Sequence, residues 1–193
     1  MTGKKPRPAE VKGKIGVPVA ADQSPGSLEL PSCGDFDIRI AADGTWFYRG
    51  SPIGRKALVK LFASVLERDS AGDYWLVTPV ERGQVTVDDV PFVAVEMSAH
   101  GQGKDQILRF RTNVDRWVEA GPENPIRVAV ASNNGEPRPY ILTWGGLEAL
   151  ILRPVFYHLV DVAVEERHHG RNALGVWSNG TFFPLGSPQD HED

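Results

Sequence analysis

The chain has 193 residues, a formal net charge of -4 and one cysteine, Cys33. This length suffices for one large domain or two small ones, and a single cysteine excludes an intramolecular disulfide and favours a reducing, cytoplasmic location. No apolar run reaches the roughly 18 residues of a membrane span, and the acidic body argues against a dedicated nucleic-acid-binding surface.

Residues 1–26 are rich in proline, glycine, lysine and alanine and show no apolar periodicity. We therefore expect a flexible basic arm, for which a solvated leader is a better interpretation than a nucleic-acid-binding tail. The remaining chain is predicted to form an N-terminal module over residues 27–83 and a C-terminal module over residues 84–188, with a short tail at 189–193.

A β-hairpin is predicted at the start of the first module. Residues 36–40 alternate apolar and polar side chains as a half-buried strand does, and residues 45–49 supply its partner. The Asp43-Gly44 pair between them predicts a type I′ turn, because such turns need positive φ at both central residues.

A helix is predicted directly after this hairpin. Ser51 is a plausible N-cap, Pro52 suits the first helical position, and apolar residues then recur at helical spacing to about residue 69. The helix is therefore expected to bury one stripe and to show its charged residues to solvent.

Strands are predicted to dominate the middle of the chain, at residues 74–78, 84–88, 92–97, 106–111, 126–131 and 138–143. From residue 145 to about residue 167 the apolar period becomes helical, which predicts a long helix that Pro154 bends or splits. Residues 176–183 then close the chain as a hairpin around an Asn179-Gly180 turn.

The chain also repeats itself. Residues 43–52 (DGTWFYRGSP) return as residues 179–188 (NGTFFPLGSP), with six of ten positions identical. A shorter echo links residues 54–59 with residues 146–151, both within predicted helices. The repeat predicts an α+β fold of two similar modules, each an antiparallel sheet plus a helix, with the cleft between them as the natural ligand site.

Reactive side chains give no recognisable catalytic or metal-binding pattern. His168 and His169 are adjacent, whereas metal ligands on one helical face are three or four residues apart. Ser51 and Ser187 occur in Gly-Ser-Pro turns without a histidine or an acid at an interpretable distance. We therefore predict no metal site and no cofactor.

Four blocks of unusual sequence cover nearly everything after the arm. They are DGTWFY at 43–48 with GSPI at 50–53 and Arg55; YWLVTPVE at 74–81 with Val87, Asp89, Pro91 and Phe92; Thr112 and Asn113; and Pro139 and Tyr140 with GLEAL at 146–150, Arg153 and GVWS at 175–178. Together they resemble a bacterial family known as domain of unknown function 1285. One departure is Trp144, where the family pattern has a basic residue before the Gly-Gly pair, which weakens a phosphate-binding interpretation.

The resemblance implies a duplicated α+β architecture. It further implies that the C-terminal module is similar to a pleckstrin-homology domain, with a bent antiparallel sheet capped by a long helix. A ligand site at the interface of the two modules, suited to a nucleotide-like molecule, and a role in signal transduction are also implied by the resemblance alone.

We predict a cytoplasmic, non-catalytic or weakly catalytic module that binds a small anionic or nucleotide-like ligand between its two halves. The predicted ligand-binding residues are polar and lie near helix starts and strand ends: Arg55, Thr78, Glu81, Arg111, Asn113, Glu148 and Arg153. Helix N-termini near Ser51 and Gly145 would add favourable dipole ends for an anion.

Two alternatives stay open at this point. A pleckstrin-like sheet and helix would serve a protein-interaction adaptor, including a homodimer, as readily as a ligand-binding protein. An enzyme would use carboxylates such as Glu81, Asp89 and Glu148, provided that two of them converge in a pocket.

Overall fold

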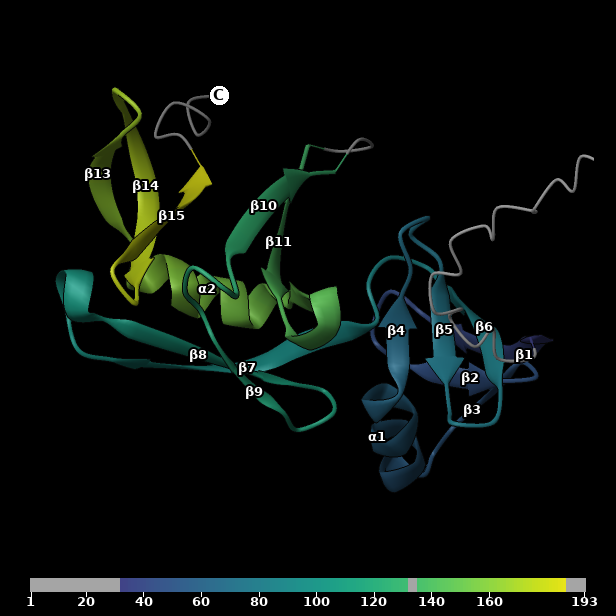
Figure 1. Cartoon of the computed structure of the whole chain (residues 1–193). Helices are drawn as coiled ribbons and strands as arrows, with labels where there is room; N and C mark the ends of the chain where they lie inside the picture. The colour runs from purple at the N-terminus through teal and green to yellow at the C-terminus, as the bar shows by residue number, and fades with distance from the viewer. Residues whose placement is uncertain (1–31, 132–134, 187–193) are drawn as a thin grey trace, which may run out of the picture.

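The computed structural model describes residues 32–131 and 135–186 (Figure 1). The expected arm at 1–26, the tail at 189–193 and Ser187 lie outside these residues. Strands predominate in the described chain, which forms two six-stranded sheets, one three-stranded sheet and two α-helices.

The first sheet has the strand order β3-β2-β1-β6-β5-β4. Its neighbouring strands are antiparallel except for the central pair, β1 and β6, which are parallel. Helix α1, Lys56–Ser64, connects β3 to β4. The strands are β1 (Ser32–Ile40), β2 (Trp46–Tyr48), β3 (Ser51–Pro52), β4 (Leu66–Arg68), β5 (Tyr74–Val77) and β6 (Arg82–Val87).

The second sheet has the order β10-β11-β12-β7-β8-β9, again with one parallel pair, β12 and β7, at its centre. Its strands are β7 (Phe92–His100), β8 (Ile107–Thr112), β9 (Trp117–Glu119), β10 (Ile126–Val130), β11 (Pro137–Leu142) and β12 (Glu148–Ile151). Short 3-10 helices lie at Gly103–Asp105 and Trp144–Gly146. Helix α2 (Arg153–Asp161) leads to an antiparallel third sheet of β13 (Val164–His168), β14 (Arg171–Ser178) and β15 (Thr181–Gly186).

The two large sheets share one topology. In each, three consecutive strands form one meander, the next three form another, and the first and sixth strands pair in parallel at the centre. Hairpin β1–β2 therefore corresponds to hairpin β7–β8, whereas the second copy of the repeated decapeptide joins β14 to β15 in the third sheet. The chain is duplicated in topology, but the decapeptide repeat does not mark equivalent hairpins.

Two of the predicted hairpin features have different outcomes. Asn179 and Gly180 have φ values of 48° and 69°, so the predicted type I′ turn is confirmed there. Of the Asp43-Gly44 pair in the first copy, only Gly44 has positive φ, 82°, and a five-residue loop closes through hydrogen bonds between Ala41 and Thr45 and between Gly44 and Ala41. The type I′ prediction at Asp43-Gly44 is therefore wrong.

The predicted helix boundaries also need correction. Ser51 and Pro52 form β3, because Arg49 and Gly50, with φ values of 48° and 77°, turn the chain back against β2. Helix α1 is consequently shorter than expected. Its apolar stripe continues past the helix because Leu66, the first residue of β4, is also buried.

The predicted long helix over residues 145–167 is wrong. Gly145 and Gly146 have positive φ values of 64° and 73°, which a right-handed helix does not accommodate, and the next residues form β12. Pro154 lies in the first turn of α2, where its missing N–H costs no helical hydrogen bond. The α-helices thus begin at Lys56 and Arg153 and not near Ser51 and Gly145.

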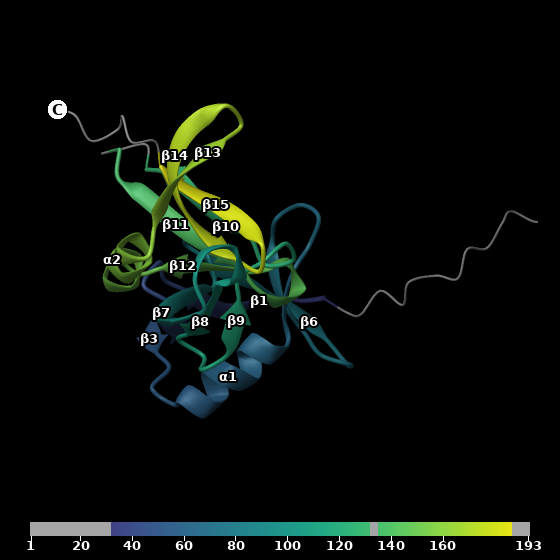
Figure 2. The same ribbon diagram turned by 90° about the vertical axis from the view of Figure 1, so that its left-hand side faces the viewer.

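One continuous core joins the two sheets. It contains Trp46 and Leu76 from the first sheet together with Phe92 and Phe110 from the second. The two views show α1 and the third sheet at opposite ends of the molecule (Figures 1 and 2). The expected module boundary at residues 83 and 84 falls inside β6, a strand of the first sheet.

Candidate functional site

The first module contains an apolar groove of about 610 Å³. It lies between α1, the strands β1 to β3 and the turn that joins β5 to β6. Most of its wall is aliphatic or aromatic, and its polar groups are the hydroxyls of Tyr48 and Ser51 on β2 and β3, Arg55 before α1, and Thr78 and Glu81 in the β5–β6 turn. The lining residues are Phe36, Ile38, Tyr48, Ser51, Pro52, Ile53, Gly54, Arg55, Leu58, Phe62, Val65, Leu76, Thr78 and Glu81.

Close packing behind the groove fixes the position of its walls. The ring of Phe62 on α1 stacks on the buried ring of Trp46, with 6.3 Å between centroids and 22° between planes. On the other wall, Phe36 covers Gly83 so closely that a Cβ atom there would lie 2.4 Å from its ring. The groove is therefore bounded by side chains that have little freedom to collapse into it.

Three of the seven predicted site residues line this groove. The Thr78 hydroxyl donates to the Glu81 carbonyl at 3.0 Å and accepts from the Glu81 N–H at 3.2 Å, which fixes the β5–β6 turn. Arg55 precedes α1 and is exposed. Within residues 32–131 and 135–186, no side chain forms an ion pair or hydrogen bond with its guanidinium.

Two other predicted residues, Arg111 and Asn113, lie where the modules meet. The Asn113 amide donates to the Gly44 carbonyl at 3.0 Å, and its oxygen accepts from the Val93 N–H at 3.3 Å. Arg111 donates to Glu96 at 2.6 Å and to a carboxylate of the β8–β9 turn at 2.9 Å. Both residues connect structural elements and have no part in the groove.

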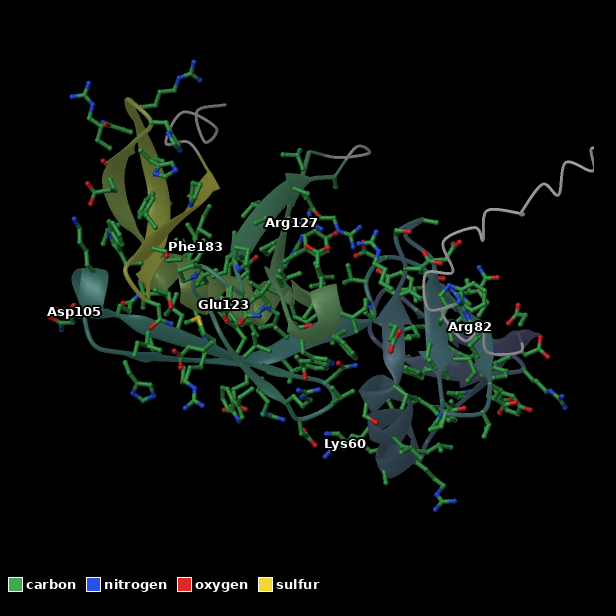
Figure 3. All side chains as sticks on the ribbon, viewed as in Figure 1. Lys60, Arg82, Asp105, Glu123, Arg127 and Phe183 are labelled. Atoms are coloured by element: carbon green, nitrogen blue, oxygen red, sulfur yellow. The ribbon has the colours of Figure 1, made fainter. Side chains whose placement is uncertain are left out.

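That carboxylate belongs to Asp115, which also binds α1. Its oxygens lie 2.8 Å from Lys56 Nζ and 2.7 Å from Lys60 Nζ. Figure 3 shows Lys60 reaching from α1 toward the β8–β9 turn. Leu58 and Phe62 are offset from these lysines by two positions, or about 200° around the helix. One face of α1 thus forms the groove, and the opposite face binds the second module.

The pKa of Asp115 is lowered well below its usual range by hydrogen bonds from Lys56 and then from Lys60. A carboxyl with a depressed folded-state pKa adds stability above its unfolded pKa of about 3.9 and loses it as pH falls through the folded value. We therefore expect Asp115→Asn to lower the melting temperature at pH 7 and the difference from wild type to shrink below about pH 4. Thermal unfolding across this pH range is the measurement.

Asp105→Asn is the matched control, because Asp105 is exposed and forms no ion pair with another described residue. It should leave the melting temperature close to that of wild type throughout. A difference between Asp115→Asn and wild type that stayed constant from pH 7 to pH 2 would contradict the assigned role of the Asp115 carboxylate.

The last two predicted residues lie in the second module. Glu148 accepts two hydrogen bonds from Arg127, at 2.5 and 2.7 Å. Arg153 binds Glu136 at 2.9 Å and lines a separate hollow of about 430 Å³ between β11, β12 and α2. The structure therefore distributes the seven predicted residues over the groove, the module interface and the second module.

Of the three carboxylates considered for an enzyme, Asp89 and Glu148 lie in one polar cluster and Glu81 lies apart. Asp89 accepts hydrogen bonds from Arg138 at 2.7 Å and from the Tyr140 hydroxyl at 3.1 Å. Burial raises the pKa of Tyr140, and the nearby Asp89 charge raises it further. Arg127 stacks over the Tyr140 ring at 4.1 Å and donates to Glu148. Asp89 and Glu148 therefore share one cluster in which both carboxylates are hydrogen-bonded. Glu81 lies apart from this cluster, on the groove.

A second, polar hollow of about 450 Å³ lies at the module interface, between residues 68–72 and the glycines at 145 and 146. Arg68 donates to the Gly72 carbonyl at 3.3 Å and lies over the Tyr74 ring at 5.5 Å. Among the described residues, no carboxylate pairs with Arg68. The guanidinium of Arg116 lies 3.7 Å from the centroid of the Trp144 ring. A cation is therefore adjacent to position 144, where the family pattern has a basic residue and this sequence has a tryptophan.

Sequence reasoning missed the groove wall and Arg68. The aromatic strand residues carry a signal for the wall, but the same pattern is typical of residues in a core. In the described part of the chain, no group of three His, Cys, Asp or Glu side chains could hold a metal ion. None of the helices described has the length and hydrophobicity needed to cross a bilayer.

Comparisons with known proteins concern the whole chain. Residues 28–90 match the family description "Domain of unknown function (DUF1285), N-terminal domain", and residues 91–185 match its C-terminal domain. No curated protein matches the sequence.

Two solved structures are similar. A DUF1285 family protein from Silicibacter pomeroyi DSS-3 is 45% identical, with a TM-score of 0.79 over 90% of this chain and 93% of that one. A DUF1285 family protein from Shewanella baltica OS155 is 25% identical, with a TM-score of 0.51 over 64% of this chain and 90% of that one. With both domains matched along nearly its full length, the chain belongs to the DUF1285 family.

Proposed function

We propose that the protein binds a small anionic ligand in the groove between the first sheet and α1. The observation that carries the proposal is a preformed apolar groove of about 610 Å³ with the exposed Arg55 in its lining. Binding sites for small molecules are typically concave, mostly apolar and equipped with a few polar groups that orient the ligand. This proposal moves the ligand from the module interface to the first module.

A role in signal transduction is a further part of the proposal. Helix α1 forms a wall of the groove through Leu58 and Phe62 and binds Asp115 of the second module through Lys56 and Lys60. A ligand that contacts α1 would therefore stabilise one position of a helix that both modules hold. Such a linkage requires only that the ligand binds one arrangement of α1 more tightly than others.

The test is thermal unfolding of the full chain against a panel of nucleotides, organic acids and neutral analogues. A ligand at a hundredfold excess over its dissociation constant stabilises the folded state by about 2.7 kcal/mol. Gly83→Ala should abolish the stabilisation, because the new methyl group would push the Phe36 ring into the groove. Leu58→Trp fills the groove from α1 and tests the same point independently.

Gly186→Ala is the control, since a Cβ atom at Gly186 meets no atom within 4 Å and Gly186 lies in the third sheet. It should bind ligand as wild type does. If no compound of the panel stabilises the wild-type chain, or if folded Gly83→Ala and Leu58→Trp both retain full affinity, the groove is not the site.

A nucleotide-like ligand at the module interface is the second candidate. The observation that favours it is the polar hollow beside Arg68, a cation without a carboxylate partner among the described residues. An arginine can bind a phosphate through two parallel hydrogen bonds. Arg68→Ala should then remove nucleotide-dependent stabilisation while leaving binding in the groove intact, and unchanged nucleotide binding in this variant would reject the candidate.

The likeness of the C-terminal module to a pleckstrin-homology domain also stays a proposal. It is supported by the steep bend between β7–β8 and β10–β11 in Figure 1 and by the packing of α2 against β7. If this likeness extends to an adaptor function, the exposed Tyr157, Val160 and Val164 on α2 and β13 supply an apolar contact surface.

A further inference from the structure

We infer that the ligand of the groove is an amphiphilic monocarboxylate, meaning an organic acid with a single carboxylate and an aliphatic or aromatic body. This inference rests on the proposed function, because it names the ligand class for the same groove. Such a ligand differs from a nucleotide in its charge, in its shape and in the number of polar groups that need hydrogen-bond partners.

The wall of the groove determines the body of the ligand. Its deeper residues are apolar, including Ile38, which is 4% exposed, and Leu76, which is 3% exposed. A nucleobase or a sugar carries several donors and acceptors that would lose their hydrogen bonds to water against such a wall, and burying an unpaired polar group weakens binding. An alkyl or aryl body has no such groups and gains free energy from the same burial.

The charged residues of the lining determine the charge of the ligand. Arg55 is the one cation among the lining residues and Glu81 is the one acid, so the lining has no net charge. A di- or triphosphate would face a single guanidinium with a carboxylate nearby. One carboxylate, in contrast, matches one guanidinium through two parallel hydrogen bonds.

The remaining polar lining residues are poor alternatives as anchors. The Thr78 hydroxyl already exchanges hydrogen bonds with the backbone of Glu81. Ser51 and Tyr48 pair with each other through their backbones in β3 and β2, and their hydroxyls supply no positive charge. Arg55 is thus the anchor for the anion, and the apolar wall selects the rest of the molecule.

The experiment titrates the full chain by calorimetry with straight-chain carboxylates of six to ten carbons and with alkanols of equal length, all below their micelle concentrations. Carboxylates should bind more tightly than alkanols, with affinity rising about fourfold per added CH2 group. Arg55→Gln should weaken carboxylate binding by about tenfold or more while leaving the alkanols unchanged. Arg55→Lys, which keeps the charge and loses the paired geometry, should lie between wild type and Arg55→Gln.

Arg109→Gln is the matched control, because Arg109 is a surface arginine of β8 whose ion pair with Glu119 is long, at 3.9 Å. It should bind carboxylates as wild type does. Equal affinity for carboxylates and alkanols, or an Arg55→Gln variant with full carboxylate affinity, would overturn the inference while leaving a groove that binds ligands.

Two further outcomes separate the inference from the function on which it rests. Nucleotides that bind the groove more tightly than carboxylates, with loss in Arg55→Gln, would retain the proposed function and reject the monocarboxylate. Failure of every compound to bind wild type would reject both. Circular dichroism of each variant shows that it is folded before it is titrated.

Discussion

Replacing Trp46 by alanine is expected to lower the free energy of unfolding by about 3–5 kcal/mol, the range for truncating a buried aromatic residue. Trp46 is 2% exposed and pairs across the sheet with Ile40, which is fully buried. Its ring also stacks on Phe62 of α1. Truncation therefore opens a cavity between the first sheet and α1 and removes the support of one wall of the groove.

Chemical denaturation monitored by circular dichroism measures this loss. Trp117→Ala is the matched control, since the Trp117 side chain is 42% exposed and lies on β9 at the edge of the second sheet. Its cost should stay below about 1 kcal/mol, apart from the loss of a weak contact with Arg109. Equal costs for the two tryptophans would show that Trp46 is not part of the core of the folded protein.

Ser178→Ala is expected to cost about 1–3 kcal/mol, because it leaves the buried Leu108 N–H unpaired. The fully buried Ser178 hydroxyl accepts from the Leu108 N–H at 2.9 Å and donates to the Ala120 carbonyl at 2.7 Å. It thereby joins the end of β14 to β8 and to the segment after β9. The Ala120 carbonyl also accepts from Asn179 Nδ2 at 2.9 Å, so it keeps one partner when the hydroxyl is removed.

The readouts are the free energy of unfolding and the hydrogen exchange rate of the Leu108 amide, which should increase. Ser64→Ala serves as the control, because the exposed Ser64 hydroxyl donates to a carbonyl of its own helix, that of Leu61, at 2.6 Å. A cost below about 0.5 kcal/mol for Ser178→Ala, equal to that of Ser64→Ala, would mean that water replaces the lost hydroxyl.

Strand positions in the middle of the chain were predictable because their pattern is local. The strand expected at 106–111 is β8, Ile107–Thr112, where buried and more exposed side chains alternate. This alternation of buried and exposed side chains does not indicate which strands pair. The parallel pairs β1–β6 and β12–β7 join residues far apart in sequence, so the shared topology of the sheets became visible only in the structure.

The long helix illustrates where periodicity misleads. Ala149 and Ile151 are buried in β12, between β11 and β7. The apolar spacing of this strand continues directly into that of helix α2, which begins at Arg153. A short buried strand next to a helix cannot be separated from it by apolar spacing alone. The two glycines at 145 and 146 were the local signal against a helix, since both adopt positive φ.

The candidate site was predictable only in part, for a similar reason. Arg55, Thr78 and Glu81 stand out in the sequence as polar residues at element ends, and all three line the groove. Phe36 and Tyr48 do not stand out, because an aromatic residue on a strand has the same pattern whether it packs against another side chain or against an open groove.

The parallel centre of each large sheet has a consequence for how the chain folds. Ile40 in β1 pairs with Val87 in β6, the last strand of the first sheet. During synthesis, the meander of β1 to β3 can form early, but the second meander, which ends with β6, can be completed and joined to the first only after β6 has left the ribosome. Contacts between distant residues slow folding, so docking of β6 against β1 should be the late, rate-determining event for this half of the protein.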